Sequence, residues 1–155
     1  MNTRNAELVT RKHMQRVSAL LGGAASEMIQ RAALHDLSKL MPEELEPLQE
    51  MQDIIDREGQ APFGSDEYKR RTAKLGGMLK HHYENNSHHP EHYENGIDGM
   101  DLYDVLEMFL DWKAASERGE ESVFNITSAV ERFHVSPQLE AIFRNTANKH
   151  GWDHK

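Results

Sequence analysis

Apolar residues recur every three or four positions along most of this chain, and this spacing is typical of amphipathic helices. Residues 4–21 are expected to form a first helix, with His13 on its apolar stripe. Gly22 and Gly23 are expected to break it, and a second helix is expected over residues 24–35. The chain therefore begins with two predicted helices that each carry an apolar face.

Two further helices are predicted before the middle of the chain. Pro42 suits a first helical turn and opens a helix expected over residues 42–57. The acidic residues of this helix, Glu44 among them, are interpreted as a solvated face. Ser65 is expected to cap the next helix, which is predicted over residues 65–82. Its lysines and arginines are interpreted as a second solvated face that balances the acidic one.

The second half of the chain is predicted to hold three more helices after a long irregular loop rich in Asn, His, Pro and Gly. No alternating strand pattern is found, so we expect an all-α, single-domain bundle of about six to seven helices over residues 1–155. A frayed tail is expected over residues 149–155. The loop and the three helices are predicted over residues 85–100, 101–117, 121–134 and 136–149.

The composition narrows the classes of function. A formal net charge of −8 argues against a protein that wraps extended nucleic acid, which needs a basic face. No cysteine is present, so disulfides, thiolate zinc sites and cysteine nucleophiles are excluded. We find neither an apolar N-terminal run nor an apolar segment of 18 residues, and we therefore expect a cytoplasmic protein without a membrane span. Ten histidines form the one compositional anomaly.

The dipeptide His35-Asp36 is the first candidate site. Apolar residues precede and follow it at helical spacing, so the pair is expected at the buried end of a helix. Two polar groups are costly to bury unless they are paired. A divalent metal ion would meet that cost, because imidazole nitrogen and carboxylate oxygen both coordinate such ions.

The predicted helix over residues 101–117 offers carboxylates. Asp104, Glu107 and Asp111 share one narrow stripe of this helix, and apolar residues cover the other side. A solvated acidic face is the more ordinary interpretation of such a stripe. The small residues Ala114 and Ala115, which flank its continuation, would let another helix approach closely, and this favours Asp111 as a buried ligand.

The segment His81–His92 holds half of the histidines in the chain. Adventitious binding of metal at the surface is the ordinary interpretation of such a cluster. Pro90, however, stiffens the loop just after His88 and His89, and a long loop inside a compact domain is more often functional than idle. The spacing leaves open which histidine of each adjacent pair coordinates; His82, His88 and His89 are taken as candidate ligands.

Along the chain the candidate residues come in the order His13, His35-Asp36, two histidine pairs and Asp111. This order resembles the H…HD…D pattern of the HD superfamily of metal-dependent phosphohydrolases. The resemblance implies a metal held by His13, His35, Asp36 and Asp111. It also implies a second metal, bridged by Asp36 and bound by the loop histidines. Lys39 matches the lysine of the HD-x-x-K signature, which in relatives contacts phosphate or the attacking water.

The chain is also similar to a group of short phage and bacterial proteins with HD-like motifs. It lacks the Gly-Tyr-Pro triplet of the cyclic-dinucleotide phosphodiesterases, which argues against that substrate. The shared segments are HDLSK, N-x-HHPEHY, EM-x-x-DWKAA, RF and QL-x-x-IF-x-NTA, at residues 35–39, 86–93, 107–115, 132–133 and 138–147.

The resemblance implies an enzyme that hydrolyses a small phosphorylated, nucleotide-like substrate with one or two divalent transition metals (Mn, Fe, Zn, Co or Ni). Lys39 would neutralise charge on the phosphoryl group, and Glu107 would orient a ligand or relay a proton. Arg132 is an alternative phosphate contact, although a surface arginine is its ordinary interpretation. Two other hypotheses stay open: a non-catalytic metal- or nucleotide-binding factor, and a di-iron oxygenase with the same ligands.

Overall fold

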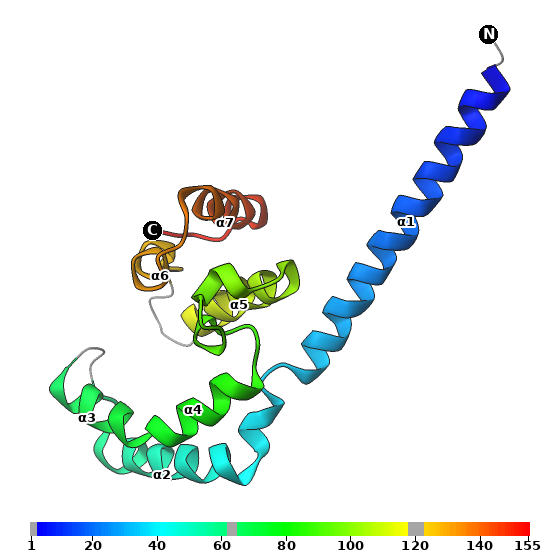
Figure 1. Cartoon of the computed structure of the whole chain (residues 1–155). Helices are drawn as coiled ribbons and strands as arrows, with labels where there is room; N and C mark the ends of the chain where they lie inside the picture. Colours follow the sequence, from blue (N-terminus) through cyan, green and yellow to red (C-terminus); the bar gives the residue numbers. More distant parts are fainter. Residues whose placement is uncertain (1–2, 62–64, 118–122) are drawn as a thin grey trace. The chain divides into compact units, whose positions relative to one another are not determined.

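The computed structural model describes residues 3–61, 65–117 and 123–155, and these are helical apart from short connections and one isolated bridge (Figure 1). The all-α fold class is therefore confirmed for the described residues. The chain divides into two compact units, Met1–His35 and Asp36–Lys155. That the whole of residues 1–155 acts as a single domain stays a prediction.

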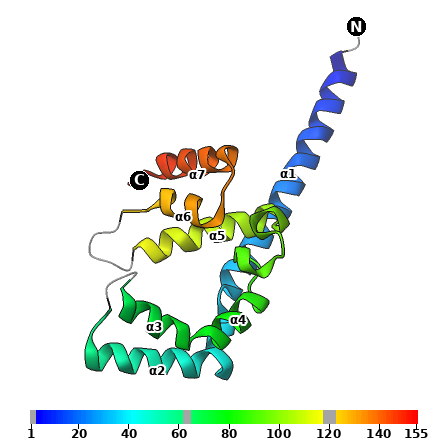
Figure 2. The same ribbon diagram turned by 60° about the vertical axis from the view of Figure 1, so that its left-hand side comes forward.

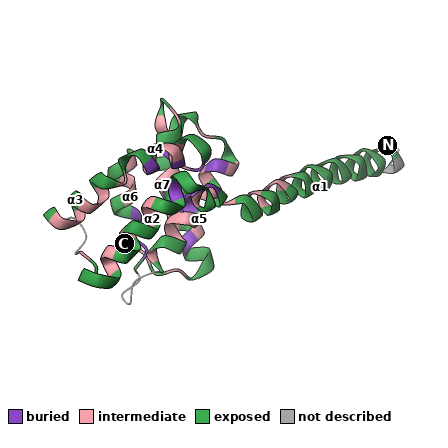
Figure 3. Cartoon of the chain, turned by 90° about the horizontal axis from the view of Figure 1, so that it is seen from below, coloured by how far each residue is buried: buried purple, intermediate pink, exposed green. Residues whose placement is uncertain are grey.

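The first unit is one helix, α1 (Thr3–Leu34), of 32 residues. The predicted break at Gly22 and Gly23 is wrong, because the helix runs through both glycines. A glycine costs a helix interior only about 1 kcal/mol relative to alanine, and alanines and leucines on both sides favour the helix. Most side chains of α1 are exposed, as its colouring in Figure 3 shows, and His13 is among them.

The second unit begins with the short helix η1 (Leu37–Leu40) and α2 (Pro42–Glu58), which α4 (Gly76–Asn85) contacts. Ser65 caps α3 (Asp66–Lys74) as expected, because its Oγ accepts a hydrogen bond from the Tyr68 N–H at 3.1 Å. The single helix predicted over residues 65–82 is instead two helices. The Leu75 N–H bonds the Thr72 carbonyl, which tightens the last turn of α3, and Gly76-Gly77 starts α4.

The loop after α4 contains the short helices η2 (Pro90–His92) and η3 (Gly96–Gly99), and it leads to α5 (Leu102–Ser116). Asp101 caps α5 through the backbone N–H groups of Tyr103 and Asp104. Two further helices, α6 (Ile126–Phe133) and α7 (Pro137–His150), complete the unit (Figure 2). The helix predicted over residues 121–134 thus begins later than expected, and residues 118–122 lie outside the described part of the chain.

The hydrophobic core of the second unit lies where α5 meets α6 and α7. The rings of Phe109 and Phe143 stack with centroids 4.7 Å apart and planes 9° apart. Leu102 is 85% exposed, because it lies in the first turn of α5, outside this contact. The core residues are Met108, Phe109, Phe124, Ile126, Val135, Phe143 and Ala147.

The C-terminal residues form part of the fold, so the expectation of a frayed tail is wrong. The Lys155 N–H donates to the Phe124 carbonyl at 3.1 Å, and the Phe124 N–H donates to the Asp153 carbonyl at 3.2 Å. Trp152 packs against the core, with its ring centroid 6.0 Å from that of Phe109. An apolar anchor and paired backbone groups hold this segment in place. Among the helices in the described ranges, none has the length and hydropathy that crossing a bilayer requires.

Candidate metal centre

Two buried histidines of the second unit point the same ring atom at one carboxylate oxygen. The Nε2 atoms of His82 and His88 each lie 3.4 Å from Oδ1 of Asp36. His82 comes from the last turn of α4, and His88 comes from the loop that follows it. Both rings are almost fully buried, at 3% and 2% exposure. The backbone of Asp36 is left-handed (φ 54°), a conformation that Asp tolerates better than most residues, and it starts η1.

His82 is held from behind by Glu44 of α2. Oε2 of Glu44 lies 2.8 Å from Nδ1 of His82, and Oε1 lies 2.8 Å from Nδ1 of His81. An ionised carboxylate only accepts hydrogen bonds, so each Nδ1 carries the proton that it donates. In neutral His82 the Nε2 lone pair is then left facing Asp36. This is the arrangement in which a carboxylate orients a metal-binding histidine.

Glu44 is fully buried, so its interpretation as part of a solvated face is wrong. Burial by itself raises the pKa of this carboxyl group. Hydrogen bonds from His81, Ser38 and His82 outweigh that effect and lower the pKa below its ordinary value. Glu44 is therefore a buried anion whose charge is compensated by donors, not by water.

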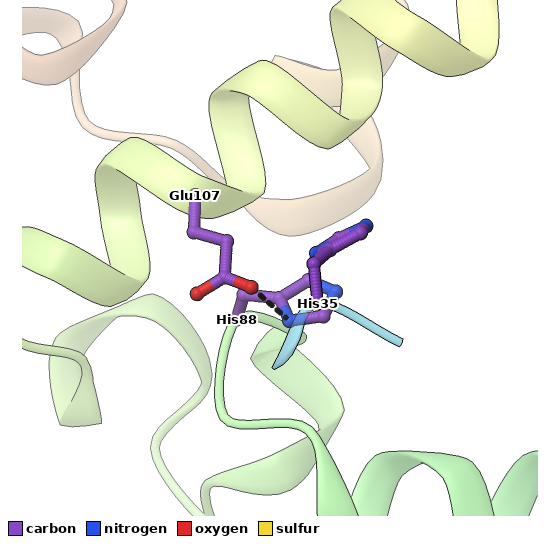
Figure 4. Close-up of side chains that lie close together, drawn as sticks. All are labelled: His35, His88 and Glu107. Carbon is purple, nitrogen blue, oxygen red and sulfur yellow. Dashed lines mark ion pairs between the residues drawn. The ribbon is translucent and has the colours of Figure 1, made fainter. Parts of the chain in front are cut away.

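His88 is oriented in the same way by Glu107 of α5. Nδ1 of His88 lies 3.3 Å from Oε1 of Glu107, and Figure 4 shows this ion pair between the loop and the helix. The side chain of Glu107 is 12% exposed. The stripe that it shares with Asp104 and Asp111 is thus not a solvated face. Two histidines therefore each have a carboxylate at Nδ1 and turn Nε2 toward Asp36.

His89 and Asp111 extend the cluster. Nε2 of His89 lies 2.9 Å from Nε2 of His82. Ligand atoms of His88, His89 and Asp111 all lie within 4.8 Å of one another, as do those of Asp36, His82 and His89. Burial lowers the pKa of His89 to about 4, and repulsion from His88 and His82 in their protonated forms would act in the same direction. At neutral pH this imidazole is therefore uncharged and has a lone pair to offer.

These distances fit a bound cation. Nitrogen and oxygen ligands about 2.1 Å from a tetrahedral ion lie about 3.4 Å from one another. The separations of Asp36 Oδ1 from His82 Nε2 and His88 Nε2 have this value. The set of imidazoles and carboxylates suits zinc, iron and manganese alike. A second carboxylate, Asp111, and a third imidazole, His89, would supply further donors for a second ion.

Lys39 pairs with the second oxygen of the Asp36 carboxylate. Its Nζ lies 2.5 Å from Oδ2 of Asp36, one turn along η1. The side chain of Lys39 is 35% exposed, whereas that of Asp36 is 13% exposed. The ammonium group of Lys39, at the edge of the cluster, is thus paired with Asp36 at its centre.

Of the residues predicted to bind metal, the second unit brings together Asp36, His82, His88, His89 and Asp111. Of the pair His81-His82, His82 belongs to these groups, while His81 binds Glu44 at their edge. Glu44 could not be found from the helical pattern, which placed it among exposed acidic neighbours.

His13 and His35 belong to the first unit, and their roles as ligands stay predictions. His13 is exposed and lies 21 residues before the C-terminal end of α1, which is about 30 Å along a straight helix. A place for His13 beside Asp36, only two residues beyond Leu34, would therefore require α1 to bend.

Asp104 has a structural place beside the cluster. Its carboxylate accepts hydrogen bonds from the Ser87 hydroxyl at 2.6 Å, the Tyr93 hydroxyl at 2.7 Å and the Asp101 N–H at 3.1 Å. Burial and the Asp104 charge raise the pKa of Tyr93 to about 12. A Cβ on Gly99 would lie 2.7 Å from Cβ of Tyr93, so only glycine fits there. These contacts fasten the histidine loop to α5.

A cavity of about 480 Å³ opens beside His89 and Asp111. Trp112 and Phe133 line it with stacked rings whose centroids are 5.3 Å apart. Its lining also includes Tyr83, Glu91 and Arg132. Burial and the charge of Glu91 raise the pKa of Tyr83, and the charge of Arg132 opposes them.

The described residues thus define an all-α protein with a buried cluster of histidines and carboxylates next to a cavity. Residues 2–149 match the family of unknown function DUF5662, and the chain belongs to that family. No curated protein and no solved structure matches the chain.

Proposed function

We propose that this protein is a metal-dependent phosphohydrolase that acts on a small, nucleotide-like phosphate ester. The observation that supports this is the arrangement around Asp36. Two buried imidazoles point Nε2 at its Oδ1 from 3.4 Å, and each has a carboxylate behind it at Nδ1. Nitrogen and oxygen donors that converge in a buried space, with carboxylates that orient the imidazoles, are the arrangement that a metal ion needs.

The ligand set that we propose is Asp36, His82, His88, His89 and Asp111. The resemblance to the HD pattern would add two further ligands to this set. These are His35, which directly precedes Asp36 in the chain, and His13. For His13 to take part, α1 would have to bend, and Gly22 and Gly23 are where a bend costs least.

The chemistry follows from these positions. A divalent ion held there would supply Lewis acidity and lower the pKa of a bound water from about 15.7 toward about 7. Lys39, 2.5 Å from Asp36, is placed to neutralise charge that develops on phosphoryl oxygens. Glu44 and Glu107 act as positioning residues, because each fixes the orientation of one histidine.

Metal analysis of the purified protein tests the proposal. We expect tightly bound Mn, Fe, Zn, Co or Ni, and we expect Asp36→Ala to lose it while the circular dichroism signal of the helices is retained. Asp53→Ala, which removes an exposed carboxylate from α2, is the matched control and should keep the metal. Full metal content in Asp36→Ala would contradict the proposal.

Turnover then separates the three hypotheses. Zinc or manganese, together with hydrolysis of p-nitrophenyl phosphate, bis-p-nitrophenyl phosphate or nucleotides, supports the hydrolase. Iron with a spin-resonance signal and oxygen consumption would point to an oxygenase. Bound ligand without turnover on the whole panel would point to a non-catalytic binding factor. A cytoplasmic location, which is the host cytoplasm if a phage encodes the protein, stays part of the proposal.

A further inference from the structure

We infer that the cavity beside His89 and Asp111 binds a phosphate monoester that carries an aromatic ring, and that Arg132 is the residue that recognises its anionic group. This inference rests on the proposed function for the reaction at the phosphate. It names the class of substrate and a contact residue that the metal cluster itself does not specify.

The size and lining of the cavity fit such a ligand. Its volume of about 480 Å³ lies within the range of about 300–1,000 Å³ that is usual for small-molecule sites. Rings from Tyr83, Trp112, Phe124 and Phe133 form much of the wall, so an aromatic group would meet apolar surface. Side chains of Ser128 and Asn125 also line it and offer hydrogen bonds to polar edges of that group.

The charges on the cavity wall indicate where the anionic group of the ligand would bind. Arg132 is the cationic side chain among the described residues that line it, and Glu91 and Asp111 are the anionic ones. If Asp111 binds a metal ion, the ion neutralises its charge. Glu91 is then the one uncompensated carboxylate that the described part of the cavity wall places beside the Arg132 guanidinium group. Nη2 of Arg132 lies 3.2 Å from Oε1 of Glu91, and the side chain of Arg132 is 63% exposed. An ion pair this exposed contributes little to stability, so a phosphate can displace Glu91.

Arg132 is also held in place before any ligand binds. Its guanidinium carbon lies 4.7 Å from the centroid of the Phe133 ring, and Phe133 in turn stacks on Trp112 with planes 8° apart. A guanidinium group that is already fixed on a ring loses less conformational entropy when it binds an anion. Tyr83, which lines the same wall, has its ring centroid 5.2 Å from that of His89 and so links this end of the cavity to the metal cluster.

Calorimetric titration of the full chain with adenosine 5′-monophosphate tests the inference, with adenosine and inorganic phosphate as comparisons. Each titration is run with chelator and again with manganese. We expect the monophosphate to bind more tightly than either fragment under both conditions. Arg132→Gln should weaken its binding at least tenfold, Arg132→Lys should weaken it less, and Glu91→Gln should strengthen it about threefold.

Arg144→Gln is the matched control, because Arg144 pairs with Glu140 on α7 and does not line the cavity. Its affinity for the monophosphate should equal that of the wild type. Equal affinity of Arg132→Gln and wild type would overturn the inference, as would adenosine binding as tightly as the monophosphate.

The same titrations distinguish this inference from the proposed function. Monophosphate binding in chelator that depends on Arg132, in a protein that takes up no metal, would leave the cavity assignment standing and remove the hydrolase. Metal uptake that depends on Asp36, with no monophosphate bound at millimolar concentration, would overturn the cavity assignment alone.

Discussion

Oε2 of Glu44 lies 2.8 Å from Nδ1 of His82, in a part of the second unit where Glu44 is completely buried. The pair joins α2 to α4 and leaves the opposite ring nitrogen of His82 facing Asp36 at 3.4 Å. A buried carboxylate that loses its donors is strongly destabilising. This contact therefore contributes to the fold and to the candidate metal centre at once.

Replacing Glu44 should affect stability and metal binding together. Glu44→Ala is expected to lower the free energy of unfolding by about 3–5 kcal/mol, because His81 and His82 lose a buried charged partner. Glu44→Gln, which keeps the volume, should weaken metal binding by about 10- to 100-fold. Urea unfolding and metal titration measure the two effects. Glu46→Ala, from an exposed site on the same helix, should change neither; similar losses in Glu46→Ala would contradict the special place of Glu44.

Lys39 should influence metal binding and turnover in opposite directions. Without metal, its ammonium group pairs with Asp36 at 2.5 Å, so it competes with a cation for that carboxylate. Lys39→Gln is expected to raise metal affinity by about fivefold, since a partly exposed pair is worth about 1 kcal/mol. If the protein is the proposed phosphohydrolase, Lys39→Gln should also lower kcat by about 100- to 1,000-fold, through loss of the group that we propose neutralises phosphoryl charge. If Lys39→Gln loses bound metal in proportion to its loss of kcat, the result would contradict a direct role of Lys39 in turnover.

Tyr93 should make stability depend on pH in the alkaline range. Its folded pKa of about 12 lies above the ordinary value of about 10, so the unfolded chain gives up this proton first. The stabilisation is complete below about pH 10 and is lost as the pH rises from about 10 to about 12. Tyr93→Phe should remove this dependence and cost about 1–2 kcal/mol, because Asp104 loses a donor. Urea unfolding at several pH values measures both; an unchanged alkaline slope in Tyr93→Phe would contradict the assignment.

The two faces of α5 should respond differently to truncation. Phe109 is 1% exposed in the core, and Leu102 is 85% exposed. Phe109→Ala is expected to lower the free energy of unfolding by about 3–5 kcal/mol, through lost burial and the cavity left behind. Leu102→Ala should change it by no more than about 0.5 kcal/mol. Thermal or urea unfolding compares them, and a large loss in Leu102→Ala would show that this residue is covered in solution.

Part of the candidate site could be predicted from sequence because its residue types are unusual where they occur. Histidines in a loop and Asp111 on the stripe of α5 are rare enough to suggest metal ligands, and the structure brings them near Asp36. Glu44 was missed because nearby acidic residues on α2 are exposed, and nothing in their spacing marks one as buried. His13 was assigned as a ligand only through the resemblance to the H…HD…D pattern, and this role stays a prediction because His13 lies on α1, in the other unit.

Local patterns in the sequence were enough to determine the helical class, the cap at Ser65 and the irregular histidine loop, because these depend on neighbours within a few positions. The partners of each polar side chain were decided only by tertiary structure. Glu44 and His82 are 38 positions apart, and their contact depends on how α2 packs against α4. Long-range packing therefore selected, from many acidic residues and histidines, the few that meet around Asp36.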